Sequence, residues 1–441
     1  MEKILSPSNQ KSWILAVDMG YGHQRTAHPL KYLAFDEKVI NANNYEGIPE
    51  KDRKIWEGTR KFYEFISNFK KVPLIGEIFF FIFNQFQKII SFYPKRDLSQ
   101  PNFFLKQIYS LFKKGWGRDL IEKLKIKNEK LKRNLPVIST FFLPAFMAGF
   151  FNYPGEIFCV VCDADISRSW APLNPKLSKI KYFAPNKRVV ERLKLYGVKA
   201  ENIFLTGYPL PQDLIGSQNF EILKEDLRYR ILNLDPQKKY FEKYKTLITD
   251  HLGKLPERPN HPLTIMFSVG GAGAQKEIGV KILRSLVKEI KTGEIKIVFS
   301  AGIREKVKEY FLKNIRNLGL EEYLGKSIEL IFAKNIEGYF QTFNQALKQT
   351  DILWTKPSEL SFYSALGLPI VISFPIGSQE EFNMRWLLKS GFGLLQENPD
   401  YTEQWLFDWL ENGYLAEAAM EGFVEGEKLG ILKISKIISA Q

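Results

Sequence analysis

The feature that most constrains this chain is a short pattern that occurs twice, once in each half of the sequence. Residues 13–17 form an apolar run (WILAV), Gly20 and Gly22 follow, and the next residues have the spacing of an amphipathic helix. The same order returns from Leu263 in LTIMFSVGGAGAQKEIGVKIL. A buried strand, a glycine turn and a helix make up the repeating unit of doubly wound parallel sheets. The sequence therefore predicts an α/β fold with two such halves.

Further short apolar runs, separated by helix-like stretches, extend the pattern through both halves. They are residues 157–162, 295–299, 328–332, 351–354 and 370–374. We expect an N-terminal Rossmann-like acceptor domain at 1–210, a helical insertion and linker at 211–262, a C-terminal Rossmann-like nucleotide-sugar domain at 263–400, and C-terminal helices at 401–441 that pack back across the domain interface.

The first glycine loop lies where a strand turns into a helix, which directs backbone N–H groups and the positive helix end toward an anion. Gly20 and Gly22 permit the close approach and the tight-turn dihedrals that such a loop needs. A dinucleotide fingerprint requires a third small residue where Arg25 stands, and no acidic residue ends the following strand, KVINAN, to hold a ribose. An NAD site is therefore disfavoured, and a glycine turn that packs helix on sheet without a ligand is the alternative.

The second half repeats this situation at Gly271 and Gly273. Two such loops, one in each half, suggest a ligand with a diphosphate held in a cleft between facing domains. The same half adds candidate donor-binding side chains, which are Lys356, Ser358, Glu359, Gln379, Glu380 and Asn383. Carboxylates accept hydrogen bonds from sugar or ribose hydroxyls, and Gln379 and Asn383 lie four apart on one helical face. As alternatives, Ser358 and Glu359 are helix caps and the glutamates are solvated.

Four segments carry a resemblance to a known family. They are GYGHQRTAHPL, then VVCDADISRSWAPLNPKLSKIKYFAPNKRVVERLKLYGVKAENIFLTGYPL, then FSVGGAGAQ, then DILWTKPSELSFYSALGLPIVISFPIGSQEEFN. In order and approximate spacing they resemble the family 28 glycosyltransferases, and among these the monogalactosyldiacylglycerol synthases and the processive diacylglycerol glucosyltransferases. The resemblance implies the GT-B fold, two Rossmann-like domains facing a central cleft. It also implies that the second domain holds most of the nucleotide-sugar donor and the first holds the acceptor.

Site residues follow from the resemblance position by position. It places Gly20, Gly22 and His23 near the acceptor and donor phosphates, Gly271 and Gly273 at the donor diphosphate, and Gln379, Glu380 and Asn383 at the sugar hydroxyls. The family has a Pro-Gly-Gly turn where this chain has Pro357-Ser358-Glu359, and Ser364 stands where the family's ribose-binding glutamate would fall. Donor recognition therefore differs: either Glu359 takes over the ribose contact or that contact is lost.

An inverting glycosyl transfer requires a base that deprotonates the acceptor hydroxyl and groups that stabilise the leaving diphosphate. His23 is the first candidate for the base or for a phosphate-side donor, because a neutral imidazole is available at about pH 7 and His23 follows the glycine loop directly. Asp163 and Asp165 are the rivals, since they end the run 157–162, and capping a loop is their alternative role. Backbone amides can stabilise the leaving group, so we expect neither a metal nor a cofactor.

The net charge of +14 is concentrated in residues 51–133, which hold 20 Lys and Arg against 8 Asp and Glu. Residues 56–116 also hold 17 aromatics, and the run 72–92 has a wide aromatic face opposite a polar stripe. Such a run is too interrupted to span a membrane and is typical of a helix at an anionic membrane interface or around a lipid tail. The alternative is that the aromatics belong to the domain core. A nucleic-acid partner is disfavoured because the phenylalanines form a continuous face and no nucleic-acid motif is present.

Together these patterns predict a glycosyltransferase that moves a sugar from a nucleotide-sugar donor, UDP-linked, to a lipid acceptor. The apolar run 13–17 is too short for a signal-peptide core, so we expect a cytoplasmic protein, peripheral on the inner face of the membrane. Two alternatives are open. One is a GT-B-like protein that binds a nucleotide sugar or an anionic lipid without transfer, which the altered turn at 357–359 favours. The other is a soluble nucleotide-sugar epimerase on the same fold.

Overall fold

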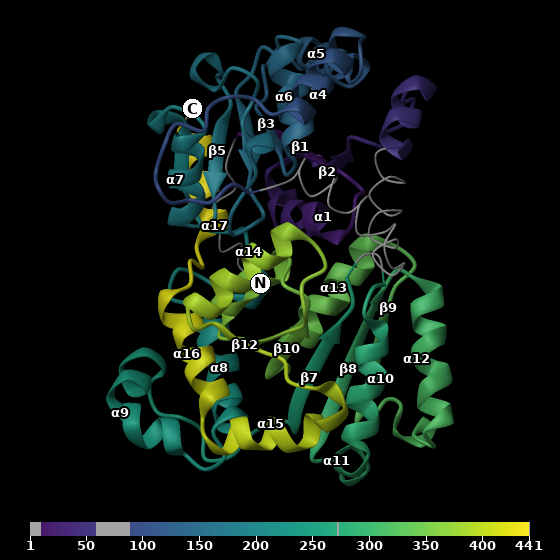
Figure 1. Ribbon diagram of the computed structural model, residues 1–441, viewed down its shortest axis with the longest axis vertical. Coiled ribbons are helices and arrows are strands. Elements are labelled where there is room, and N and C mark those ends of the chain that lie inside the picture. The colour runs from purple at the N-terminus through teal and green to yellow at the C-terminus, as the bar shows by residue number, and fades with distance from the viewer. Residues whose placement is uncertain (1–9, 59–88, 271–272, 441) are drawn as a thin grey trace. The chain divides into compact units, whose positions relative to one another are not determined.

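The structure, a computed structural model, describes residues 10–58, 89–270 and 273–440 (Figure 1). Gly271 and most of the aromatic run 72–92 lie outside the described residues. The chain divides into two compact units. The first comprises Met1–Leu210, Ile376–Asn383 and Leu429–Gln441, and the second comprises Pro211–Pro375 and Met384–Lys428.

The first unit is built on a sheet of six parallel strands in the order β2-β1-β3-β4-β5-β6. The strands are β1 (Ser12–Ala16), β2 (Ala34–Asn41), β3 (Val137–Ser139), β4 (Ile157–Val160), β5 (Lys181–Ala184) and β6 (Ile203–Leu205). Every residue of β1, β3 and β4 is buried, as expected for a parallel sheet covered on both faces. Because β2 and β3 lie on opposite sides of β1, the strand order reverses between β1 and β3.

Helices connect these strands. They are α1 (Tyr21–Ala27), η1 (His28–Leu33), α4 (Phe103–Lys113), α5 (Arg118–Leu131), α6 (Phe142–Phe150) and α7 (Lys187–Leu195), with the 3-10 turns η2 (Arg168–Trp170), η3 (Pro175–Leu177) and η4 (Ala200–Asn202). The last helix of the chain, α17 (Gly430–Ser439), also belongs to this unit.

The second unit contains another sheet of six parallel strands, in the order β12-β11-β10-β7-β8-β9. The strands are β7 (Leu263–Ser268), β8 (Ile295–Gly302), β9 (Ile328–Phe332), β10 (Ile352–Thr355), β11 (Ile370–Ile372) and β12 (Gly393–Leu395). Counted from β7, this is the strand order of dinucleotide-binding Rossmann folds. The order reverses between β7 and β10.

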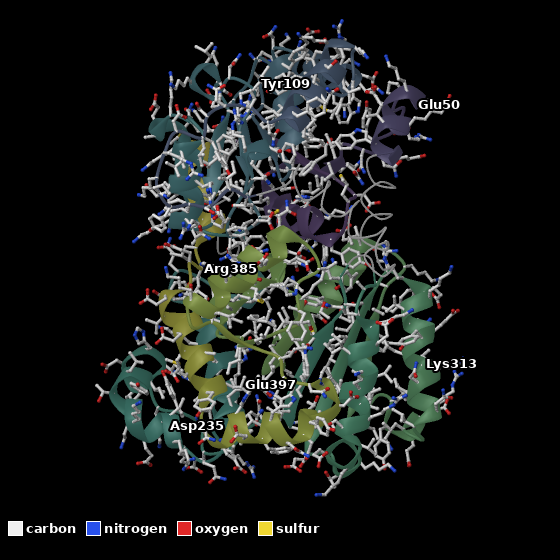
Figure 2. All side chains as sticks on the ribbon, in the orientation of Figure 1. Glu50, Tyr109, Asp235, Lys313, Arg385 and Glu397 are labelled. Atoms are coloured by element: carbon white, nitrogen blue, oxygen red, sulfur yellow. The ribbon has the colours of Figure 1, made fainter. Side chains whose placement is uncertain are left out.

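Helices again alternate with the strands. They are α8 (Glu221–Leu234), α9 (Lys239–Leu252), α10 (Lys276–Ser285), α11 (Val287–Thr292), α12 (Glu305–Asn317), α13 (Ile336–Leu347), α15 (Thr402–Glu411) and α16 (Tyr414–Glu425), with the 3-10 elements η5 (Gln212–Leu214), η6 (Glu321–Tyr323), η7 (Glu359–Leu366) and η8 (Pro399–Tyr401). Helix α14 (Ser378–Lys389) begins with residues of the first unit and ends with residues of the second. Charged residues such as Lys313 of α12 are exposed to solvent (Figure 2).

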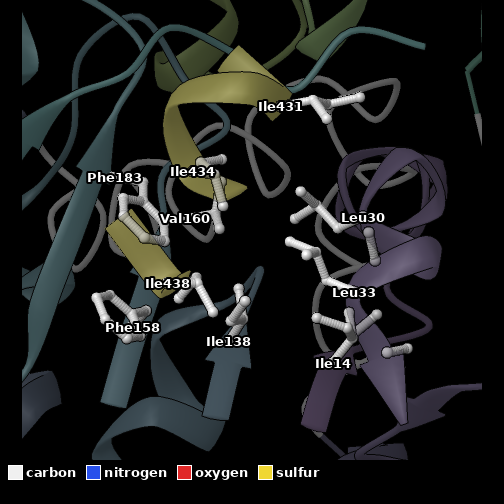
Figure 3. Packing of buried hydrophobic residues seen from close by; sticks show 13 residues of the cluster. Ile14, Leu30, Leu33, Ile138, Phe158, Val160, Phe183, Ile431, Ile434 and Ile438 are labelled. Carbon is white, nitrogen blue, oxygen red and sulfur yellow. The ribbon is translucent and has the colours of Figure 1, made fainter. Parts of the chain in front are cut away.

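The hydrophobic core of the first unit joins the sheet to the last helix of the chain (Figure 3). Ile14 of β1 and Ile138 of β3 pack in one cluster with Leu30 and Leu33 of η1 and with Ile434 of α17, and all five are fully buried. Burial of one such side chain stabilises the fold by about 1.5–3 kcal/mol. Helix α17 therefore supplies part of the core on which the first sheet rests.

The α/β class and the two Rossmann-like domains predicted from the sequence are confirmed by these two sheets, and a strand forms at each predicted apolar run. One detail differs from the prediction. Strand β4 ends at Val160, so Asp163 and Asp165 lie in the loop beyond the strand rather than at its end. The loop after β10 leads into the 3-10 helix η7. No helix within the described residues is long and apolar enough to cross a membrane.

Candidate functional site

His23 is the third residue of α1, the helix that follows β1. Gly20 precedes this helix at a φ of 108°, a backbone conformation that side chains with a Cβ rarely adopt. Gly22 is the second residue of α1, and its carbonyl accepts a hydrogen bond from Thr26 Oγ1 at 2.8 Å. The glycine at position 20 therefore allows the sharp turn that brings His23 to the carboxyl edge of the first sheet.

The orientation of the His23 ring is set by Thr140, which follows β3. His23 Nδ1 lies 2.8 Å from the Thr140 carbonyl oxygen, and Thr140 Oγ1 donates to the His23 carbonyl oxygen at 2.8 Å. Because a carbonyl oxygen accepts and never donates, Nδ1 carries the proton. The Nε2 atom of the neutral ring therefore holds the lone pair that a base needs.

Apolar and soft groups enclose the same ring. Cys162 Sγ lies 3.4 Å from His23 Nδ1, the ring centroid of Phe141 is 4.6 Å away, and that of Trp170 is 6.4 Å away. Burial lowers the pKa of His23 to about 4, although the hydrogen bond to Thr140 acts in the opposite direction. The imidazole is therefore neutral at neutral pH.

The loop after β4 brings Asp163 and Asn383 together within the first unit. The Asn383 side chain is buried, its Oδ1 accepts from the Ala164 N–H at 2.8 Å, and its Nδ2 donates to Asp163 Oδ1 at 3.3 Å. Asn186 Nδ2 donates to the Ala164 carbonyl oxygen at 3.0 Å. Two amide side chains thus fix this loop, and the expected contact of Asn383 with a sugar hydroxyl stays a prediction.

Asp165 is held in a buried ion pair. Its two carboxylate oxygens accept from Nε and Nη2 of Arg192, each at 2.8 Å, and both side chains are buried. Asp165 Oδ1 also accepts from the Ile166 N–H at 2.9 Å, while Arg192 Nη1 donates to the Ile90 carbonyl oxygen at 2.8 Å. This geometry favours a structural role for Asp165 over the role of a base, because its oxygens are already engaged.

In the second unit, Gly270 and Lys356 meet at the carboxyl edge of the sheet. A Cβ added to Gly270 would lie 2.4 Å from Lys356 Cε, so the lysine side chain crosses directly over the glycine backbone. Gly273 has a φ of 69°, and its N–H donates to the Gly270 carbonyl oxygen at 2.7 Å. The glycines thus leave room for a cation beside exposed backbone, which is an arrangement suited to an anion.

These two loops leave the sheet side by side because β7 and β10 are paired, with Ser268 opposite Thr355. Thr355 Oγ1 also donates to the Ser268 carbonyl oxygen at 3.2 Å. Ligands of open α/β sheets bind at the carboxyl ends of the strands, where the strand order reverses. The pair Gly270 and Lys356 lies at that point of the second sheet.

The remaining predicted donor residues lie on η7 and α14. Glu359 is buried at the start of η7, and Ser358 precedes it without capping the helix through its side chain. Glu380 Oε2 accepts from the Ile376 N–H at 2.8 Å, so this carboxylate closes the turn before α14. Gln379 is partly exposed on the same helix. The roles predicted for these side chains toward a donor stay predictions.

Sequence reasoning missed Thr140 and Arg192, which complete the geometry around His23 and Asp165, respectively. The run PVIST ending at Thr140 carried a usable signal, because an apolar run followed by a polar residue marks the end of a strand. Among the described residues, no group of three or more His, Cys, Asp or Glu side chains is placed to hold a metal ion.

Comparisons with known proteins give remote similarities. A family model described as "Domain of unknown function (DUF6938)" matches residues 255–327. No curated protein matches the chain in sequence. Among solved structures, MurG of Acinetobacter baumannii is 13% identical at a TM-score of 0.44, covering 73% of this chain and 77% of that one.

Two further solved structures align with this chain over almost the whole length of both chains. The S. aureus MnaA-UDP co-structure is 14% identical at a TM-score of 0.47, covering 96% of this chain and 95% of that one. A glycosyltransferase from Rickettsia africae ESF-5 is 14% identical at a TM-score of 0.42, covering 97% of this chain and 98% of that one.

Proposed function

We propose that this protein is a glycosyltransferase that moves a sugar from a nucleotide-sugar donor, UDP-linked, to the hydroxyl of a lipid acceptor. The observation that carries the proposal is the state of His23. Its Nδ1–H donates a hydrogen bond to the Thr140 carbonyl oxygen, and burial keeps the ring neutral. This leaves Nε2 as an oriented base at the edge of a parallel sheet where substrates of α/β enzymes bind.

The donor diphosphate belongs to the second unit in this proposal. Gly270, Gly273 and Lys356 lie where the strand order reverses, and the order itself is that of nucleotide-binding sheets. Backbone N–H groups and the Lys356 ammonium suit the two phosphates of a nucleoside diphosphate. Glu359 is the candidate for the ribose hydroxyls, and the resemblance to family 28 supports Gln379, Glu380 and Asn383 for the sugar.

The reaction needs one proton acceptor and one site for a leaving anion. The acceptor hydroxyl oxygen attacks the anomeric carbon of the donor while His23 Nε2 takes the hydroxyl proton. The bond from the anomeric carbon to the diphosphate oxygen breaks, and the nucleoside diphosphate leaves with the bonding electrons. Lys356 and the glycine-loop backbone stabilise the charge that builds on it.

The lipid character of the acceptor rests on the basic, aromatic stretch 51–133. In its described part, Tyr93, Phe103 and Ile126 are 68%, 64% and 49% exposed. Lys127 and Lys130 of α5 are exposed as well. Exposed apolar side chains among cations suit an anionic membrane surface, where each lysine contributes about 1 kcal/mol. Liposome flotation with and without anionic lipid tests this part, and failure to float in either case would defeat it.

A second candidate function is nucleotide-sugar binding without transfer. Glu359 stands where the resembled family has glycine, and its carboxylate is buried near the start of η7. A negative charge close to a leaving diphosphate opposes the charge that builds on it, which favours binding over transfer. The epimerase alternative shares the fold but has no such observation in its favour.

One experiment separates these functions. The protein is screened against a panel of nucleotides and nucleotide sugars by thermal shift, and the best-binding sugar nucleotide is then incubated with lipid extract and followed by mass spectrometry. A lipid whose mass grows by one hexose supports transfer. Binding without a product supports the second candidate, and a changed free sugar nucleotide supports an epimerase.

A further inference from the structure

A cavity of about 290 Å³ lies between the edge strand β2 and the helix α5 of the first unit. Its lining comes from two strands and one helix. The residues are Trp13 of β1, Phe35, Asp36, Lys38 and Ile40 of β2, and Lys127, Lys130 and Leu131 of α5. None of them belongs to the candidate site, and Trp13 lies at the amino end of β1 whereas His23 follows its carboxyl end.

An irregularity of the edge strand opens this cavity. Between Ala34 and Val39 the pairing advances by five residues on β2 but by only two on β1, so four residues of β2 lie opposite Trp13. Two of the four, Asp36 and Glu37, have a φ of 52°, a backbone conformation that residues with a Cβ rarely adopt. Bulges of this kind turn side chains out of the regular alternation of a strand, and they are frequent next to functional sites.

The apolar part of the lining is built on two aromatic rings. Trp13 and Phe35 are in contact, with ring centroids 5.1 Å apart and ring planes at 57°. Trp13 Nε1 donates to Asn128 Oδ1 at 2.9 Å, and Asn128 Nδ2 donates to the Tyr153 hydroxyl oxygen at 2.8 Å. Because the single polar group of the indole is engaged inside the fold, Trp13 offers the cavity only apolar surface.

Cations surround this apolar surface. Lys38, Lys127 and Lys130 are exposed, and Lys127 Nζ lies 5.4 Å from the centroid of the Trp13 ring. Within the part of the chain that the structure describes, the three lysines and Asp36 form neither an ion pair nor a side-chain hydrogen bond. Three ammonium groups against one carboxylate give the lining an excess of positive charge that the protein does not neutralise.

This lining selects a small ligand with an apolar body and an anionic group. The positive excess attracts an anion, and the side chains of residues 1–9, which hold one glutamate and one lysine, would leave that excess unchanged. An aromatic ring can pack against Trp13 and Phe35 in the offset or edge-on geometries that aromatic pairs prefer. The volume is just below the range of about 300–1,000 Å³ for pockets of drug-sized ligands, which suits one ring system rather than a lipid with two chains.

We propose that this cavity binds a small aromatic anion, a flat ring that carries one carboxylate or one phosphate. The ring contacts Trp13 and Phe35. Lys127 and Lys130 are three residues apart on α5 and share one side of that helix, so their ammonium groups donate together to the oxygens of the anion. The proposal stands apart from the proposed function, because sugar transfer uses none of these residues.

Calorimetry on the full-length protein tests the cavity with two probes, indole-3-acetate and phenyl phosphate. At least one should bind, and the tighter of the two shows whether a carboxylate or a phosphate is preferred. Indole-3-acetamide lacks the charge and octanoate lacks the ring, so each should bind at least about tenfold more weakly than the better probe. Equal binding of either comparison compound would overturn the proposal of an aromatic anion.

Substitutions determine whether the probe occupies this cavity. Lys127→Gln combined with Lys130→Gln should weaken the better probe about tenfold or more, because two charged hydrogen-bond donors are lost. Lys113→Gln on α4 removes an exposed lysine of the same unit outside the cavity and should leave binding unchanged. Melting curves establish that the variants fold, since all three lysines are exposed. Binding of neither probe by the wild-type protein, or binding that the double variant retains, would overturn the proposal.

Discussion

The two sheets reverse their strand order at corresponding places, yet the residues at these places differ in chemistry. In the first unit, the reversal lies between β1 and β3, and it holds a neutral histidine among Phe141, Trp170 and Cys162. In the second unit, the reversal lies between β7 and β10, and it holds the cation of Lys356 over the backbone of Gly270. The same backbone architecture thus places an apolar enclosure at one reversal and a cation beside glycine backbone at the other.

In the proposed function, this difference assigns a separate role to each half. The enclosed imidazole of His23 is the proposed proton acceptor, because burial keeps it unprotonated. Lys356 beside glycine backbone is the proposed phosphate contact, because close approach and positive charge are both available. A glycosyl transfer requires both functions. Substitutions in each unit can separate them.

The largest effect is expected on stability, when the buried ion pair between Arg192 and Asp165 is broken. Arg192→Ala should lower the free energy of unfolding by about 3–5 kcal/mol, because it leaves Asp165 as a buried charge without a partner. Lys194→Ala on the same helix is the control: its pair with Glu191 is exposed, so the expected change is about 0–1 kcal/mol. Urea denaturation measures both. Equal losses would make Asp165 a candidate base again.

Removal of the proposed base should have the next largest effect. His23→Ala should lower turnover about 100-fold or more, because the acceptor hydroxyl then loses its proton acceptor. Affinity for the nucleotide should change little, since the proposal assigns the donor diphosphate to the second unit. His251→Ala, in α9 of that unit, is the matched control and should keep full activity. Retained turnover in a folded His23→Ala protein would remove His23 from the mechanism.

Removal of the cation in the second unit should act on the donor instead. Lys356→Ala should weaken nucleotide binding about 10- to 100-fold, because a charged contact with phosphate is lost. Lys313→Ala, on the exposed face of α12, provides a lysine control in the same unit. Calorimetry with the best-binding nucleotide measures both variants. Unchanged affinity in Lys356→Ala would place the diphosphate elsewhere.

The smallest effect is expected when the pH is lowered moderately from neutrality, because the pKa of His23 is already low. Since the pKa of His23 is lowered to about 4, kcat/KM should fall only as the pH drops below about 4. Unfolded chains protonate histidine near pH 6.5, so the stability of the folded state also falls as pH drops from about 6.5 to about 4. Circular dichroism at each pH separates the two losses. An acid limb near pH 6.5 in a fully folded protein would contradict a buried, neutral His23.

The sequence was sufficient for the fold class and for the glycine loops of the site. Apolar runs followed by glycines and helical spacing predicted the first strand of each sheet, because a strand buried on both faces is a continuous apolar run. The shorter strands β3, β5, β6 and β12 were not among the predicted runs. The same spacing identified the loop of Gly20 and Gly22 and placed His23 next to it. These are local features, set by residues within a few positions of one another.

The partners of these residues could not be predicted, because tertiary contacts bring them together. Thr140, which orients the His23 ring, lies 117 residues away along the chain. Asp165 was a candidate base by its position after a strand, and its engagement with Arg192, 27 residues away, arises from the packing of α7. A sequence pattern states which group follows a strand, whereas only the fold shows which group already has a partner.

The most direct test of the account is the stoichiometry of a single reaction. The protein is incubated with a labelled nucleotide sugar and a lipid acceptor, and the released nucleoside diphosphate and the new glycolipid are counted together. The account predicts one glycolipid for each nucleoside diphosphate released, and loss of both products in His23→Ala. Release of the diphosphate without any glycolipid, or equal product from His23→Ala, would contradict it.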